Sequence, residues 1–112
     1  MIRSLLRPEP TAPLTEATFC ILAALAEARH GYAIMQWVSE ATRQRVKLGP
    51  GTLYGALTSL QERGCIKAVG EGLEGNERRK VYGLTTRGRA LLEAEIQRLE
   101  SIARLGRKAL GH

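Results

Sequence analysis

The chain has 112 residues, which is enough for one domain with a small core and a short tail. Its net charge of +6 and isoelectric point of about 9.9 favour an anionic partner such as nucleic acid or an acidic membrane surface, with a solvated basic protein as the alternative. It has no run of 18 apolar residues, no secretory-signal pattern and no metal-ligand spacing at Cys20 and Cys65, so we expect a cytoplasmic protein whose cysteines are reduced core residues.

The first 13 residues predict a flexible N-terminal arm. Pro8, Pro10 and Pro13 make a continuous helix unfavourable over residues 8–13. The preceding segment, MIRSLLR, is either mobile or a short helical piece that docks on a partner subunit. We therefore place the first domain boundary after residue 13.

Two short helices are predicted to follow the arm. Thr15 suits an N-cap, and the first helix is expected to run to about Ala28. The second is expected to run from Tyr32 to about Thr42, and a short basic connection that includes Lys47 follows it. The residues expected to face the core are Phe19, Leu22, Leu25 and Ala26 in the first helix and Ile34, Met35, Val38 and Ala41 in the second.

A third helix is predicted in residues 49–64, where the sequence reads GPGTLYGALTSLQERG. Gly49 is an acceptable N-cap, Pro50 suits the first helical position, and Gly64 suits a left-handed C-terminal cap. The apolar stripe consists of Leu53, Ala56, Leu57 and Leu60. The opposite face is small and uncharged and consists of Thr52, Tyr54, Gly55, Thr58, Ser59 and Gln61. Such a face suits close approach to another polar surface, and the major groove of DNA is one candidate.

A β-hairpin is predicted next, with strands at residues 65–69 and 79–85 and a glycine-rich turn at residues 70–78. Its descending limb carries three consecutive cations, Arg78, Arg79 and Lys80. Beside a hairpin tip they can contact a phosphate backbone, and the alternative is that they protect the strand edge by charge. The hydroxyl of Tyr82 could also bind a phosphate oxygen, unless the ring only fills the strand.

The last predicted helix starts at Thr85 or Thr86 and runs to about Lys108. Its apolar seam consists of Leu92, Ile96, Leu99, Ala103, Gly106 and Leu110, and Leu91 and Ile102 widen it. Steps of four and three predict pairing with a second helix across a subunit interface, with packing on the chain's own core as the alternative. The solvated side is predicted to carry Glu93, Glu95 and Glu100.

No enzymatic site is indicated. Residues 70–75 match G-x-G-x-x-G, but a strand and not a helix follows, so a dinucleotide site is not expected. His30 and His112 form no pattern with a carboxylate or a second ligand, and neither cysteine has the setting of a nucleophile. We therefore predict no enzyme, no metal and no cofactor.

Three sequence blocks resemble the PadR family of bacterial transcription regulators: HGYAIM at 30–35, GPGTLYGALTSLQERGCI at 49–66 and RRKVYGLTTRGRALLEAE at 78–95. The single final helix resembles the smaller subfamily. The resemblance implies a winged helix-turn-helix homodimer that binds a palindromic operator, usually as a repressor, and that a small hydrophobic molecule can release. It also implies that Thr52 and Tyr54 contact DNA, with Tyr32, the basic wing and Tyr82 in matching positions. Two departures are Gly55, where many members have proline, and Trp37, which lies on the second helix and not on the last.

Together these observations predict a mainly α fold with a small β-hairpin, a winged helix-turn-helix with a long C-terminal dimerisation helix. Its parts are an arm (1–13), a DNA-binding domain (14–85) and a dimerisation helix with a short tail (86–112). The predicted DNA contacts are Tyr32, Lys47, Thr52, Tyr54, Thr58, Ser59, Arg78, Arg79, Lys80 and Tyr82. The predicted dimer contacts are Leu92, Ile96, Leu99, Ala103 and Leu110. The alternative function is a winged-helix protein-interaction module without sequence-specific DNA binding.

Overall fold

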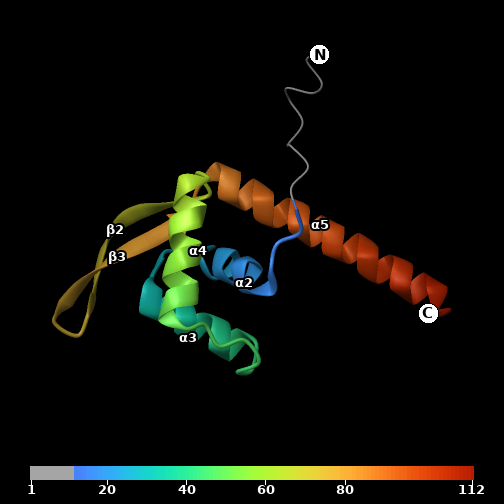
Figure 1. Cartoon of the computed structure of the whole chain (residues 1–112), viewed down its shortest axis with the longest axis horizontal. Helices are drawn as coiled ribbons and strands as arrows, with labels where there is room; N and C mark the ends of the chain where they lie inside the picture. The colour runs from blue at the N-terminus through green and yellow to red at the C-terminus, as the bar shows by residue number, and fades with distance from the viewer. Residues whose placement is uncertain (1–11) are drawn as a thin grey trace, which may run out of the picture.

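A computed structural model describes residues 12–112, apart from the side chain of Glu74, so the predicted arm lies almost wholly outside the described residues. Within this range the elements are α2 (Glu16–Ala24), β1 (Arg29–His30), α3 (Gly31–Ala41), α4 (Pro50–Glu62), β2 (Ile66–Glu74), β3 (Glu77–Leu84) and α5 (Thr86–Ala109). The strands form one antiparallel sheet in the order β1-β3-β2. Figure 1 shows α2, α3 and α4 grouped beside the hairpin, with α5 extending away from them. The predicted mainly α fold with a hairpin wing is confirmed.

Helix α2 is shorter than predicted. The side chain of Thr15 caps it by accepting a hydrogen bond from the amide of Thr18, as expected, but the helix ends at Ala24 and not at Ala28. The chain leaves the helix because β1 pairs with Tyr82 and Val81 of β3, a non-local contact that the local pattern does not contain. The buried residues are Ile21, Leu22, Ala24 and Leu25, and Ala26 is exposed, so its predicted place in the core was wrong.

Helix α3 begins at a cap that the sequence analysis did not identify. Nδ1 of His30 accepts a hydrogen bond from the amide of Ala33 at 3.2 Å. Ile34 and Val38 are buried as predicted, whereas Ala41, at the last turn, is exposed. The following loop turns sharply through two left-handed residues that are not glycine, Arg43 and Gln44, with φ of 52° and 64°.

Helix α4 agrees closely with its prediction. It begins at Pro50 after Gly49, and Gly64 takes the left-handed conformation beyond its end with φ of 73°. The amide of Cys65 donates to the carbonyl of Leu60 at 2.8 Å, which completes the C-terminal cap. The three leucines of the stripe, Leu53, Leu57 and Leu60, are at most 1% exposed, so this face is fully used by the chain's own core.

The wing is longer than predicted. Strands β2 and β3 continue to Glu74 and Glu77, so most of the predicted turn at residues 70–78 is paired strand. Gly75, with φ of 62°, and Asn76 make the turn between the strands. Gly70 and Gly72, which suggested a loop, lie in paired strand opposite Val81 and Arg79, with a register shift between Ala68 and Gly70.

Helix α5 starts against the end of α4. The side chain of Thr85 caps it, accepting from the amide of Gly88 at 3.1 Å, and donates to the carbonyl of Gly64 at 2.6 Å. Arg87 donates to the carbonyl of Arg63 at 3.4 Å. A Cβ on Gly88 would lie 1.9 Å from the carbonyl oxygen of Cys65, so only glycine allows this approach. The two helices are therefore joined by direct contacts at this corner.

Beyond its first turns α5 leaves the core. Leu91 and Leu92 pack against the buried cluster. Glu95 is 7% exposed, which contradicts its predicted solvated position, because its carboxylate accepts two hydrogen bonds from Arg98 at 2.6 and 2.8 Å and one from the amide of Leu14 at 2.9 Å. Every residue from 99 to 112 is exposed.

Candidate nucleic-acid interface

The polar face of α4 is open, as predicted. Thr52, Tyr54, Thr58 and Ser59 are all exposed, and the leucines on the opposite side hold this face outward. The hydroxyl of Thr58 donates to the carbonyl of Tyr54 at 2.9 Å, so it remains available to a ligand mainly as an acceptor. The helix presents small and hydrogen-bonding groups to the outside and no ionised group along these positions.

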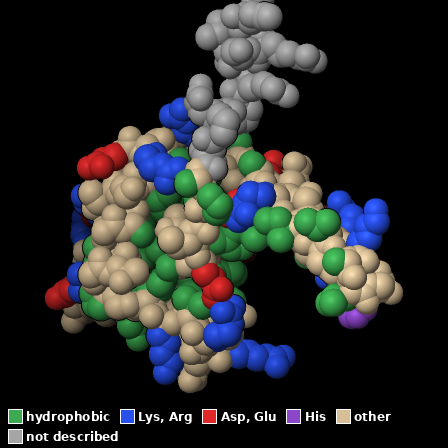
Figure 2. Space-filling model, turned by 45° about the vertical axis from the view of Figure 1, so that its right-hand side comes forward, with side chains coloured by type: hydrophobic (Ala, Val, Ile, Leu, Met, Phe, Trp, Pro, Cys, Tyr) green, Lys and Arg blue, Asp and Glu red, His purple; other side chains and the backbone are tan. Residues whose placement is uncertain are grey.

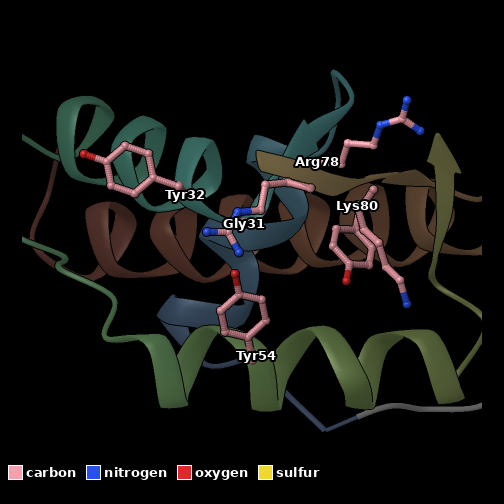
Figure 3. Close-up of a pocket in the computed structure, with 7 residues that line it drawn as sticks. Gly31, Tyr32, Tyr54, Arg78 and Lys80 are labelled. Atoms are coloured by element: carbon pink, nitrogen blue, oxygen red, sulfur yellow. The ribbon is translucent and has the colours of Figure 1, made fainter. Parts of the chain in front are cut away.

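A hollow of about 210 Å³ lies between the start of α3, helix α4 and the wing. It gathers six of the predicted DNA contacts around one glycine, and its lining consists of Gly31, Tyr32, Tyr54, Arg78, Arg79, Lys80 and Tyr82. Figure 3 shows the hydroxyl of Tyr54 pointing from α4 toward Gly31, and Lys80 descending from the wing toward α4. The guanidinium of Arg78 points away from Tyr54 in the same view. The hollow therefore combines the Tyr54 hydroxyl with cations of the wing, which suits an anion.

The wing is less basic than its arginine run suggests. Glu71 pairs with Arg78 at 3.4 Å and Glu77 with Arg79 at 2.5 Å. Between Ile66 and Leu84 the chain has four basic and three acidic residues. Among the described residues no ion pair involves Lys80. Among the described residues of the wing, the charge of Lys80 is therefore not offset by an ion pair, whereas Arg78 and Arg79 are partly neutralised by exposed carboxylates.

Two predicted contacts lie in different settings. Tyr82 is only 8% exposed and belongs to the core cluster, so it mainly fills the strand, although it also lines the hollow. Lys47 is exposed in the loop before α4. In the same loop Arg45 pairs with Glu16 at the start of α2. Direct contact of Tyr82 or Lys47 with DNA stays a prediction.

A second exposed surface runs along α5 and consists of apolar side chains. The exposed fraction rises along the helix from 38% at Ile96 and 43% at Leu99 to 53% at Ile102 and 76% at Leu110. Ala103 is also exposed, whereas Leu92 is half-buried against its own core and can contribute to a second interface only in part. Leu105, 68% exposed, was not identified as part of this seam. Figure 2 shows hydrophobic side chains spaced along the helix where it projects from the body.

Two observations concern the reactive residue types in the described part of the chain. Burial and then the nearby Glu16 carboxylate raise the pKa of the Cys20 thiol, which disfavours the thiolate that a nucleophile needs. Within residues 12–112 no three histidine, cysteine or acidic side chains gather as metal ligands. No helix in the described part of the chain is long and apolar enough to cross a membrane.

Sequence reasoning missed three contributors to these surfaces. His30 caps α3, Gly31 underlies Tyr54, and Glu95 fixes the middle of α5. A signal for His30 was available, because its side chain directly precedes a helix-like run and can accept from the third amide beyond it. Burial of Glu95 depends on the backbone of Leu14, 81 residues away in sequence, and no local pattern contains that contact.

The sequence is similar to a known protein family and to a known protein. The sequence model of the transcriptional regulator PadR-like family matches residues 21–94. An uncharacterized 37.1 kDa protein in transposon TN4556 of Streptomyces fradiae is 40% identical over 91 residues, which are 80% of this chain and 24% of that protein, so the chain spans about a quarter of this relative's length.

Solved structures of PadR proteins have a similar fold. A PadR family transcription regulator from Clostridium difficile R20291 is 26% identical, with a TM-score of 0.71 over 86% of this chain and 99% of that one. Bacillus subtilis PadR in complex with operator DNA is 24% identical, with a TM-score of 0.65 over 76% of this chain and 48% of that one. At this level of identity the second likeness concerns the fold alone.

Proposed function

The chain belongs to the PadR-like family of transcriptional regulators, and we propose that it binds a palindromic DNA operator as a homodimer and represses transcription. Membership in a family of regulators agrees with the prediction that the chain is not an enzyme. Each subunit would place α4 in a major groove and the wing along the flanking backbone. We propose that the protein binds its operator in the cytoplasm.

The observation that carries the proposal is the juxtaposition of the exposed polar face of α4 with the cations of the wing. The small side chains of Thr52 and Ser59 would let the helix approach base edges, and Lys47 in the loop before α4 and Lys80 in the wing are exposed and would meet phosphates. Helix α4 itself contains no arginine for reading guanine, and Arg63 follows only at its C-terminal cap. Direct base discrimination is therefore modest, and we expect the shape of the DNA to supply part of the specificity.

The open seam on α5 supports dimerisation through this helix. Four large apolar residues beyond Glu95 are between 38% and 68% exposed, namely Ile96, Leu99, Ile102 and Leu105. A contiguous apolar stripe of this kind is unfavourable in water and is covered when a second copy packs against it. The dimer would then hold two α4 helices about 34–36 Å apart, the separation of successive major grooves on one side of DNA.

We also propose that a small hydrophobic ligand releases the protein from DNA, because direct contacts couple the end of the α4 segment to the start of α5. Thr85 and Arg87 of the α5 start hydrogen-bond the last carbonyls of the α4 segment, and Gly88 packs on Cys65. A ligand that changes how two α5 helices pack would move this corner and change the spacing of the two α4 helices. Reduced operator affinity follows if the new spacing no longer matches the grooves.

The test is a selection from random duplex DNA by the purified protein, with fluorescence anisotropy at low and physiological salt and sequencing of the enriched pool. Enrichment of a palindrome with half-sites about one helical turn apart is expected. Salt-sensitive binding without enrichment would replace the regulator by a sequence-blind DNA-binding protein. Absence of binding at low salt would favour the protein-interaction module.

A further inference from the structure

Gly31 occupies a position where the backbone does not require glycine. It is the first residue of α3, and its φ lies outside the left-handed region. An alanine is free of backbone strain there and is the better helix former. The reason for the glycine must therefore be sought in what surrounds it.

The surroundings identify Tyr54 as that reason. A Cβ at position 31 would lie 2.6 Å from the Tyr54 hydroxyl oxygen and 3.1 Å from Cζ of the same ring. The next neighbour, a methyl of Leu53, would be 3.3 Å away. All three distances are shorter than ordinary contacts of a Cβ, and the one to the Tyr54 hydroxyl is by far the shortest, so a larger residue would have to displace the phenol ring and would also crowd the Leu53 methyl. Figure 3 shows this ring rising from α4 to the start of α3.

Glycine at position 31 leaves room for the Tyr54 hydroxyl at this place, and the hydroxyl stays unused within the described part of the protein. Tyr54 is 47% exposed, and among the described residues no hydrogen bond engages its hydroxyl. The group lies on the hollow that Lys80 and Tyr32 also line. The Tyr54 hydroxyl and the Lys80 ammonium group share this opening and are a suitable donor pair for a phosphate, whereas the hydroxyl of Tyr32 points away from both (Figure 3).

We infer that this hollow receives one phosphodiester of the DNA backbone, that the Tyr54 hydroxyl donates a hydrogen bond to it, and that Gly31 is the positioning residue that holds the hydroxyl there. The inference rests on the proposed function, since the phosphate belongs to bound DNA. Lys80 supplies the counter-charge and Tyr32 the rim of the opening. Gly31 touches no DNA itself and acts only through the place of the Tyr54 ring.

A double-mutant cycle tests this role. Tyr54→Phe removes the hydroxyl and is expected to weaken binding of the selected operator about tenfold, the usual effect of losing a hydrogen bond to a charged group. Gly31→Ala, which displaces the hydroxyl, is expected to weaken it by a similar factor. In the double variant the two effects should not multiply, because Gly31→Ala has no hydroxyl left to displace.

Thermal denaturation and a matched glycine variant separate positioning from folding. Gly70→Ala in the wing is the control, since a Cβ there meets nothing within 4 Å, and its affinity should equal that of the wild type. Multiplying effects in the cycle, or wild-type affinity in either Tyr54→Phe or Gly31→Ala, would overturn the inference. A fall in midpoint temperature that explains the whole loss of affinity in Gly31→Ala would do the same.

Neutral methylphosphonates placed one at a time in the operator identify the phosphate. One position per half-site is expected to weaken the wild type about tenfold and to weaken Tyr54→Phe clearly less, because that variant loses only the Lys80 contact to the same phosphate. If no position behaves in this way while the wild type still binds the operator, the hollow is not a phosphate site but the proposed function stands. If the wild type selects no DNA at all, the proposed function itself has failed.

Discussion

Helices α4 and α5 carry the same kind of apolar periodicity but use it differently. In α4 the leucines at positions 53, 57 and 60 are at most 1% exposed and pack inside their own chain. In α5 the large apolar residues from Ile96 onward are at least 38% exposed. One stripe completes the core of a subunit, and the other remains unpaired because the helix extends past that core. A pattern in sequence therefore identifies an apolar face but not the chain that covers it.

The consequence for function is a division of tasks between the two helices. The buried stripe of α4 fixes its polar face outward, where small side chains suit a groove. The open stripe of α5 suits a second copy. The corner at Thr85, Arg87 and Gly88 joins the two, so the geometry of one helix constrains the other.

The largest expected effect comes from breaking the open stripe. Leu99→Asp would place a carboxylate in an apolar interface, which costs several kcal/mol unless it is paired. We expect the dimer to dissociate and operator affinity to fall by more than about a hundredfold, because the second half-site contact is lost. Sedimentation velocity and anisotropy measure both. Ser101→Asp, on the other side of the helix, is the control, and a surviving Leu99→Asp dimer would show that α5 is not the main seam.

The buried stripe should respond in stability and not in assembly. Leu57→Ala is expected to lower the free energy of unfolding by about 2–5 kcal/mol, because it leaves a cavity in a packed core. Leu105→Ala, at a 68% exposed site, should change the stability of the subunit by far less. Urea denaturation at matched protein concentration compares them, since dimerisation contributes to apparent stability. Equal losses would erase the distinction between the two stripes.

The wing provides the next prediction. Replacing Arg79 and Lys80 with alanine should weaken binding to every DNA sequence. It should also reduce the slope of log affinity against log salt by about 0.9 for each phosphate contact removed. Anisotropy over a series of KCl concentrations measures this slope. An unchanged slope would remove these two cations from the interface.

A smaller effect of opposite sign is expected at Glu71. Its carboxylate lies 3.4 Å from Arg78 and is exposed, so the pair is worth little to stability. Glu71→Gln frees Arg78 for a phosphate and should tighten DNA binding about two- to fivefold at low salt, with no change in the unfolding midpoint. Glu93→Gln on α5 is the matched control. Weaker binding by Glu71→Gln would mean that the ion pair orients the arginine.

The smallest effect concerns pH. The Arg98 guanidinium, and then the amide of Leu14, hold the pKa of the Glu95 carboxyl below its ordinary value of 4.5. A carboxyl with a lowered native pKa stabilises the fold above about pH 4.5 and loses this contribution as pH falls through the native value. Acid titration of stability should therefore be less steep in Glu95→Gln. Identical curves would assign the acid loss to other carboxylates.

The sequence predicted those helix ends that are set by residues at the ends themselves. The ends of α4 were predictable because Gly49, Pro50 and Gly64 act through their own backbone, and the start of α5 because Thr85 caps it directly. The end of α2 and the length of the wing were not, since both depend on pairing with β3. The glycines at 70 and 72 read as turn residues but lie in paired strand.

The candidate site was predictable in membership but not in arrangement. The cations and tyrosines that line the hollow were selected as DNA contacts from the sequence, yet the neutralising partners Glu71 and Glu77 became visible only in three dimensions. The steric role of Gly31 depends on a ring 23 positions later. Such contacts arise from the packing of α3 against α4, for which a single sequence has no local signal.

The most direct test of the central claim is the number of chains bound to a selected operator, measured by sedimentation equilibrium of the complex. Two chains are expected on the full palindrome, bound in one cooperative step, with a large loss of affinity when one half-site is scrambled. One chain bound with equal affinity to full and half operators would contradict it, because the open stripe of α5 would then have no role in DNA recognition.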